Sequence, residues 1–280
     1  MKKILLPTDF SDNSWNAIKY VLKLYKKEEC IFFLLNAYTP IIYQMEYFSI
    51  GNAQAGIINT AVETSEKGLD EMLQKIKIEF KNSKHSFSKI SSFNTLISEI
   101  KRLLLGHVFD SIVMGTKGAT GAQEILFGSN AVHVIKSAKC PVLTIPSDFS
   151  FEEPLEILFP SDYEVDFQEK QLQPIIDIAL SYHSQINILN VSYGKDLTEK
   201  QERNKQKLEL YFKKIAHIFH SVRNQDVPEA ISKFQVKARI NLLVMINNKH
   251  SFFENLFFKS TINQIGFHLK IPFLVLSSNA

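Results

Sequence analysis

The chain has 280 residues, of which 45% are hydrophobic, and a formal net charge of +3. This length suits two domains of about 140 residues each, and the small, scattered charge argues against nucleic acid as a partner. No stretch approaches the roughly 18 apolar residues of a membrane span, and the first apolar run stops at Pro7, too early for a signal peptide. We therefore expect a cytoplasmic protein with no membrane partner.

Four segments recur in the same order in the two halves of the chain. The pairs are 3–12 with 156–165, 30–38 with 185–193, 110–118 with 241–249, and 140–147 with 271–278. Recurrence in order at similar spacing indicates a tandem duplication. We place the two domains at 1–148 and 153–280, with the polar segment SDFSFEE as the linker between them.

In the first half, short apolar runs alternate with segments of helical period. Unbroken apolar runs are typical of parallel strands whose two faces are both covered by helices. A first helix follows the N-cap residues Ser11–Ser14. A second carries an apolar stripe from Leu69 to Phe80. The strands are predicted at 3–7, 30–37, 85–90, 110–114 and 141–145.

The segment 40–56 is longer than the usual two to six residues of such a connection. A lid over a pocket, a dimer contact and a wandering loop are the alternatives for it.

The second half repeats the pattern. A capping box at Thr198 and Gln201 starts its second helix, and its third strand is predicted at 218–222. The stripe of that helix is Leu208, Tyr211, Phe212, Ile215 and Ile218. Each half is thus predicted to be an α/β domain with an open five-stranded parallel sheet, strand order 3-2-1-4-5 and right-handed crossovers. We expect the fifth strands or nearby helices of the two halves to be in contact.

The two cysteines, Cys30 and Cys140, each begin an apolar run. Neither clusters with histidine at metal-ligand spacing. Buried thiols in a reducing compartment are the expected state, because cysteine is among the most buried residue types. We expect no metal site.

The segment GTKGATGAQEILFGSN (115–130) follows the fourth strand. In open α/β sheets, ligands bind beyond the carboxyl ends of the strands where the strand order reverses. Asp9 follows the first strand, which would lie beside the fourth, so we expect Asp9 close to this segment. Glycines allow close approach of backbone amides to an anion. A helix that starts at Gly128 would add free amides and the positive end of its dipole. The segment lacks the Gly-Lys-Ser/Thr of the Walker loop, so an anion site and a flexible turn are the alternatives.

The spacing resembles that of the universal stress protein family, whose ATP-binding members carry Gly-x₂-Gly-x₉-Gly-Ser/Thr. Gly115, Gly118, Gly128 and Ser129 match this motif, and the opening ILLPTDFSDNSWNA also looks like the family's start. The likeness covers nearly the whole chain. It implies a tandem member with a Rossmann-like, adenine nucleotide alpha hydrolase-like fold. The implied nucleotide-binding residues are Pro7, Thr8, Asp9, Ala37, Met114, Gly115, Lys117, Gly118, Gly128, Ser129 and Asn130.

Within that resemblance, Asp9 holds the position that contacts the adenosine part, and the backbone of Ala37 holds the position that reads adenine. The second half departs from the motif. Ile246 and Lys249 replace the first two glycines, and Phe258-Lys259 replaces Gly-Ser. We expect this half to keep its architecture without its site.

The leading expectation is a protein of stress response or signalling that binds ATP, or ADP or AMP, in its first half. The need for Mg²⁺ is left open. A homodimer is the preferred assembly, and the protein partners are unknown. An interaction module of the same fold that binds no nucleotide is the alternative. A hydrolytic enzyme is disfavoured because Asp9 is the one carboxylate clearly at the site, and hydrolysis needs a general base and usually a metal. Slow ATP turnover is left open.

Overall fold

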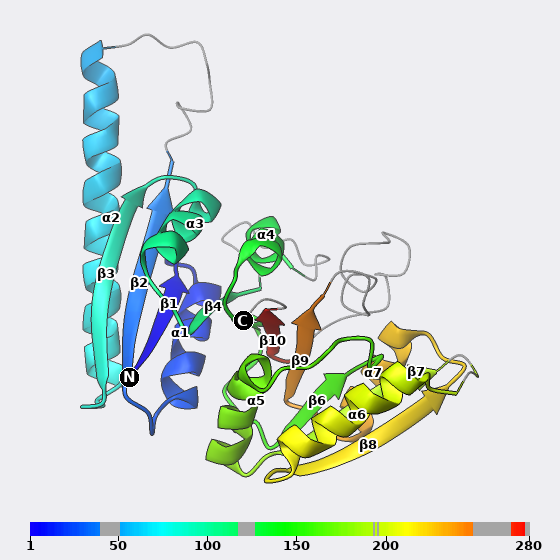
Figure 1. Ribbon diagram of the computed structural model, residues 1–280. Coiled ribbons are helices and arrows are strands. Elements are labelled where there is room, and N and C mark those ends of the chain that lie inside the picture. The colour runs from blue at the N-terminus through cyan, green and yellow to red at the C-terminus, as the bar shows by residue number, and fades with distance from the viewer. Residues whose placement is uncertain (40–50, 117–126, 193, 195, 249–269, 278–280) are drawn as a thin grey trace. The chain divides into compact units, whose positions relative to one another are not determined.

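The computed structural model describes residues 1–39, 51–116, 127–192, 194, 196–248 and 270–277 (Figure 1). The chain divides into two compact units, Met1–Ala138 and Lys139–Ala280. No helix in these described ranges is long and apolar enough to cross a membrane.

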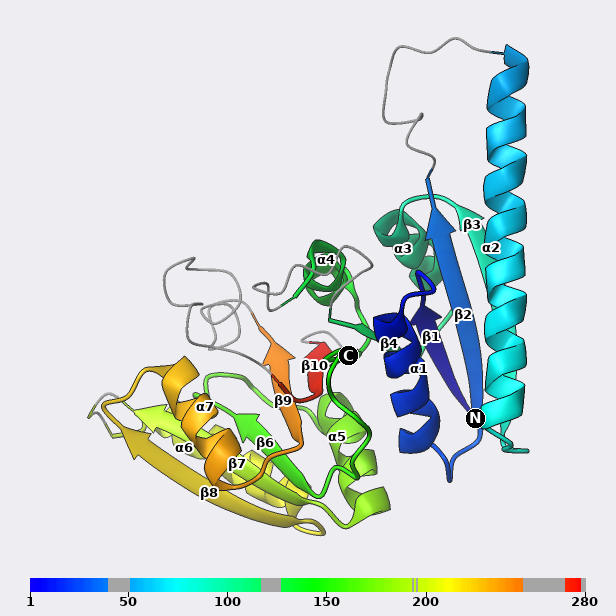
Figure 2. The same cartoon turned by 180° about the vertical axis from the view of Figure 1, so that it is seen from behind.

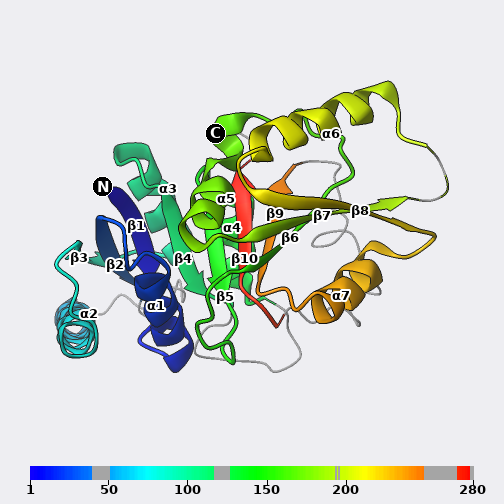
Figure 3. The same ribbon diagram turned by 90° about the horizontal axis from the view of Figure 1, so that it is seen from below.

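Unit 1 is a parallel sheet with helices on both faces. Its strands have the order β3-β2-β1-β4. Figure 3 shows α1 and α2 on one face and α3 on the other. The elements are β1 (Lys2–Pro7), α1 (Asp12–Leu24), β2 (Cys30–Tyr38), α2 (Gly51–Glu79), β3 (His85–Phe93), α3 (Leu96–Gly106), β4 (Ser111–Gly115) and α4 (Ser129–Ser137).

The centre of the unit 1 sheet is buried on both faces, as its continuous apolar sequence predicts. Ile4, Leu5 and Leu6 of β1 are all fully buried. Successive residues of a strand point to opposite faces of the sheet, so burial of all three requires helices on both faces. The first helix begins where predicted, with Ser11 as N-cap and its side chain accepting a hydrogen bond from the backbone N–H of Ser14.

Helix α2 differs from the prediction at its start. It begins at Gly51 and runs for 29 residues, so residues 51–56 are helical and are not part of a long loop. Residues 40–50 lie outside the described part of the chain. The apolar stripe that marks this helix in the sequence begins only at Leu69, where the helix packs on the sheet. Figures 1 and 2 show its first turns extending past the ends of β2 and β3.

Unit 2 repeats the architecture. Its parallel strands have the order β8-β7-β6-β9-β10, with α5 and α6 on one face and α7 on the other (Figure 3). The elements are β5 (Val142–Ile145), β6 (Glu156–Pro160), α5 (Glu169–Tyr182), β7 (Gln185–Ser192), α6 (Glu199–Phe212), β8 (Ala216–Arg223), α7 (Val227–Lys237), β9 (Leu242–Asn247) and β10 (Phe273–Ser277).

The fifth strands of the two repeats pair with each other. β5 and β10 are antiparallel, with Thr144 opposite Phe273 and Val142 opposite Val275. Strand β5 therefore belongs to unit 2, although it is the last strand of the first repeat. The predicted order 3-2-1-4-5 is confirmed, and so is the expected contact between the fifth strands.

The capping box of α6 is confirmed: the Thr198 side chain accepts from the Gln201 backbone, and the Gln201 side chain accepts from the Thr198 backbone. The predicted stripe was too long. Helix α6 ends at Phe212, so Ile215 lies in the turn that follows. Ile218 lies on β8, where it is 45% exposed.

Strand pairing gives a residue-by-residue match between the repeats. Pro7 lies opposite Leu35 in the first repeat, and Pro160 lies opposite Leu189 in the second. Asn36 therefore corresponds to Asn190, which shifts the predicted match of 30–38 with 185–193 by one residue.

Candidate functional site

A pocket of about 180 Å³ lies in unit 1 at the carboxyl ends of β1, β2 and β4 and the start of α4. Nine of the eleven residues expected at the nucleotide line it: Pro7, Thr8, Asp9, Ala37, Met114, Gly115, Gly128, Ser129 and Asn130. The other two, Lys117 and Gly118, lie outside the described residues. Segments more than a hundred residues apart thus meet where the strand order reverses.

Three lining residues were missed by the sequence analysis: Ser14, Leu96 and Ala131. Ser14 was visible only as an N-cap type. Leu96 opens α3, and Ala131 lies in the first turn of α4. Their contribution depends on how the helices sit on the sheet, for which the sequence carries no local signal.

The turn after β1 is held by side-chain hydrogen bonds. Thr8 Oγ1 accepts from the backbone N–H of Phe10 at 3.0 Å and lies 3.0 Å from Ser14 Oγ. Phe10 has φ 62°, a left-handed conformation that costs a non-glycine residue energy. The Thr8 hydrogen bond offsets that cost and fixes the direction in which the next side chains leave the strand.

Asp9 is exposed in this turn. Its Oδ1 accepts from Ser11 Oγ at 2.5 Å and from the Ser11 backbone N–H at 3.1 Å. The carboxylate is therefore oriented by its own turn.

The loops after β1 and β2 are tied together. The Asn36 side-chain amide donates to the Thr8 carbonyl at 2.8 Å, and both residues are buried. This bond sets Ala37 beside the turn that carries Asp9.

Gly115 is required for close packing. A Cβ there would lie 2.5 Å from Nδ2 and 2.7 Å from Cγ of Asn13. The motif glycines at the described positions do not adopt a left-handed backbone. Gly194 is the one glycine with positive φ among the described residues, and Gly128 has φ −61°. Gly115 acts through the absence of a side chain.

The N-terminus of α4 faces the same pocket. Gly128 is its N-cap, and no side chain caps the helix. The Gly128 N–H donates to the Thr116 carbonyl at 2.7 Å, which fixes the entry to the helix. The first amides of the helix and the exposed side chains of Ser129 and Asn130 make an arrangement suited to an anion.

Comparisons with known proteins agree with this fold. The family model described as "Universal stress protein family" matches residues 1–146, which is more than half of the chain. The chain belongs to the universal stress protein family. Two universal stress proteins of Methanocaldococcus jannaschii are 34% and 33% identical to it, over 51% of this chain in each case and over 94% and 81% of their own lengths.

The fold of the whole chain is also found among solved structures. A universal stress protein of Archaeoglobus fulgidus matches 98% of this chain and 96% of its own, with a TM-score of 0.70 and 19% identity. At that identity the likeness establishes the fold alone. The match over the whole chain supports two repeats of one fold in this universal stress protein.

The second repeat keeps the turn after its first strand but replaces the glycine that ends the fourth strand and lines the unit 1 pocket. Ser161 Oγ accepts from Tyr163 N–H at 3.0 Å, and Asp162 Oδ1 accepts from Glu164 N–H at 3.1 Å, as Thr8 and Asp9 do in the first repeat. Strand register places Ile246 at the position of Gly115. Lys249, Phe258 and Lys259 lie outside the described residues.

Proposed function

We propose that unit 1 binds an adenine nucleotide, with ATP as the leading candidate and ADP or AMP as the other forms. The observation that carries the proposal is the pocket of unit 1. It gathers, from four separate segments, nine of the eleven residues that the family resemblance implies for nucleotide binding. Asp9 and Ser129 are exposed, so their side chains are accessible to a ligand in the pocket.

Each group has a distinct part in this binding. The carboxylate of Asp9 accepts hydrogen bonds from the adenosine part, and the backbone of Ala37 contacts adenine. The amides at the start of α4, with Ser129 and Asn130, hold phosphate oxygens. The volume of about 180 Å³ is below the roughly 300–1,000 Å³ of pockets that enclose a drug-sized ligand. The pocket would therefore hold part of the nucleotide.

The proposed role is nucleotide-dependent stress response or signalling without efficient catalysis. The Ser11 hydroxyl donates to Asp9, and the described residues of the pocket include no histidine to act as a base. Mg²⁺ would be bound through the nucleotide's phosphates, and slow turnover is compatible with the proposal. We further propose a cytoplasmic homodimer without a nucleic-acid partner, consistent with the formal charge of only +3.

The test is the Asp9→Asn variant, which keeps the size of the side chain and removes its charge. We expect ATP affinity to fall by roughly 1–3 kcal/mol, because a hydrogen bond to a charged group is lost. Isothermal titration calorimetry measures the change. The control is Asp70→Asn, which removes an exposed carboxylate that pairs with Lys89 outside the pocket. Unchanged ATP affinity in Asp9→Asn would remove Asp9 from the site.

Nucleotide that co-purifies with the protein separates this proposal from its alternative. Chromatography of the heat-released small molecules should show adenine nucleotide. If none is released and ATP produces no heat on titration, the fold serves as an interaction module instead.

A further inference from the structure

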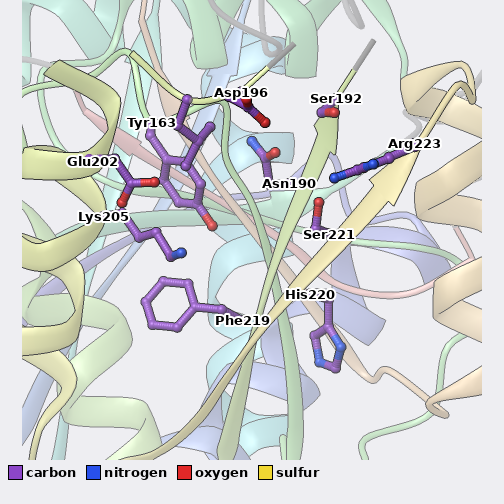
Figure 4. A pocket seen from close by; sticks show the side chains of 11 residues that line it. Tyr163, Asn190, Ser192, Asp196, Glu202, Lys205, Phe219, His220, Ser221 and Arg223 are labelled. Atoms are coloured by element: carbon purple, nitrogen blue, oxygen red, sulfur yellow. The ribbon is translucent and has the colours of Figure 1, made fainter. Parts of the chain in front are cut away.

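A second pocket, of about 370 Å³, lies within unit 2 (Figure 4). It is formed by the carboxyl ends of β7 and β8, the turn after β6 and helix α6. It does not coincide with the position of the unit 1 site, which corresponds to the ends of β6 and β9. The pocket of the second repeat therefore lies at a different place in the fold from the unit 1 pocket.

Four polar side chains form the floor of this pocket. Strand pairing sets Asn190 opposite Ser221 and Ser192 opposite Arg223. Alternate residues of a strand share one face, so these four lie on the same face of the sheet. Figure 4 shows Arg223 extending from β8 toward Asn190 and Ser221. Two serine hydroxyls and one asparagine side chain thus lie on the same sheet face as the guanidinium.

Aromatic side chains form one wall. Phe219 precedes Ser221 on the same strand face, and its ring centroid lies 6.4 Å from that of Tyr163. Lys205 Nζ of α6 lies 5.6 Å from the centroid of the Phe219 ring, which places this face beneath α6. The pocket has an apolar wall beside a polar floor.

The first repeat shows what normally fills this place. By strand register, Ser192 corresponds to Tyr38 and Arg223 to Phe93. The rings of Tyr38 and Phe93 pack edge to face, with centroids 6.0 Å apart. In the second repeat a hydroxymethyl group and a guanidinium replace two rings. This exchange opens the pocket and gives it a charge.

The two cations of the pocket have no carboxylate paired with them in the part of the chain that the structure describes. Among the described residues, neither Arg223 nor Lys205 has a salt-bridge partner within 4.0 Å. The planar fork of arginine matches the two oxygens of a carboxylate or phosphate. Asp196 and Glu202 also line the pocket, so the formal charge of the lining balances. That balance favours an anion of low charge over a triphosphate.

We propose that unit 2 binds a small organic oxyanion, a carboxylate or phosphate monoester that carries an aromatic ring. Arg223, Ser192 and Ser221 hold the oxyanion, and Phe219 and Tyr163 contact the ring. This site is independent of the nucleotide proposed for unit 1.

The experiment titrates the full chain with phenyl phosphate, phenylacetate and the neutral benzyl alcohol, in the presence of ATP. We expect at least one anion to bind and benzyl alcohol to bind far more weakly. The Arg223→Gln variant should bind that anion about 10-fold to 100-fold more weakly, because a bidentate charged contact is lost. Ser192→Tyr with Arg223→Phe restores the first repeat's ring pair and should abolish binding. A preference for phenyl phosphate or for phenylacetate identifies the headgroup, and either supports the site.

Arg203→Gln is the matched control, because Arg203 is an exposed residue of α6 that pairs with Glu199 and does not line the pocket. Arg223→Lys keeps the charge without the fork and should bind with intermediate affinity, which covers the case that Arg223→Gln fails to fold. The proposal is overturned if neither anion binds at millimolar concentration, if benzyl alcohol binds equally well, or if the Arg223 variants bind as the wild type does. Failure of the unit 1 proposal would instead change the ATP titration and leave these results intact.

Discussion

At the scale of single residues, the motif glycines act for different physical reasons. Asn13 prevents any side chain at position 115, because its amide occupies the space that a Cβ would need. Gly128 has an ordinary extended backbone. It serves the site because it begins α4 without a side-chain cap, which leaves the first amides of the helix available to a ligand. The spacing of the motif is visible in the sequence. The reason for each glycine is visible only once α1 is packed against β4.

Gly115→Ala should destabilise unit 1 by about 1–3 kcal/mol, the usual cost of forcing an extra methyl group into a packed site. The new Cβ would lie 2.5 Å from the Asn13 side chain. Urea unfolding followed by circular dichroism measures the loss. Truncation of the neighbour, in Gly115→Ala with Asn13→Ala, should cost less than the sum of the two single changes. Strict additivity would show that Asn13 does not set the requirement.

At the scale of elements, the central strands were predictable because they are continuous apolar runs, whereas the edge strand β3 (HSFSKISSF) mixes polar and apolar residues. All five strands predicted in the first half are present, with ends that differ by at most three residues. The start of α2 was not predictable, because the apolar stripe that marks this helix in the sequence begins only at Leu69. The unit 2 pocket was hidden for another reason. Ser192, Ser221 and Arg223 are ordinary residues in sequence, and only strand register brings them together.

Helix α3 sets Leu96 in the unit 1 pocket, and its start depends on a buried carboxylate. Thr95 caps the helix, and Glu99 is 1% exposed. Arg102 donates to Glu99 through Nε at 3.0 Å and Nη2 at 2.5 Å. These hydrogen bonds hold the pKa of Glu99 below its ordinary value, against the opposing effect of burial.

The pH dependence follows from the direction of that pKa. A lowered folded-state pKa contributes stability above the unfolded-state pKa, and this contribution is lost as pH falls through the folded value. Below about pH 5 the wild type should therefore lose stability more steeply than Glu99→Gln. Urea midpoints measured between neutral and acidic pH test this. Parallel curves for the two proteins would contradict the assignment, and Glu71→Gln on the exposed face of α2 serves as the control.

At the scale of the whole molecule, the two repeats share one fold but have their pockets at different places in it. Both repeats keep the hydrogen bond from an asparagine amide to the turn after the first strand, Asn36 to Thr8 and Asn190 to Ser161. This bond holds the loop scaffold. The variable positions lie around it: Gly115 against Ile246 on the side of the unit 1 pocket, and Tyr38 against Ser192 on the other. The shared scaffold therefore tolerates different residues at the positions that line the pocket in each repeat.

The last prediction is that each chain binds one nucleotide, in its first repeat. Ile246 replaces Gly115, a residue that lines the unit 1 pocket, so the turn around Asp162 lacks this part of the motif. Gly128→Phe should abolish binding and leave the fold intact, because φ −61° at this N-cap is accessible to any residue.

ATP at about 100 times its Kd stabilises the folded state by about 2.7 kcal/mol. It should therefore raise the melting temperature of the wild type and of Gly106→Phe, where a Cβ meets no atom within 4 Å. It should leave that of Gly128→Phe unchanged. Two nucleotides per chain in calorimetry, or ATP stabilisation that survives in Gly128→Phe, would place the site elsewhere.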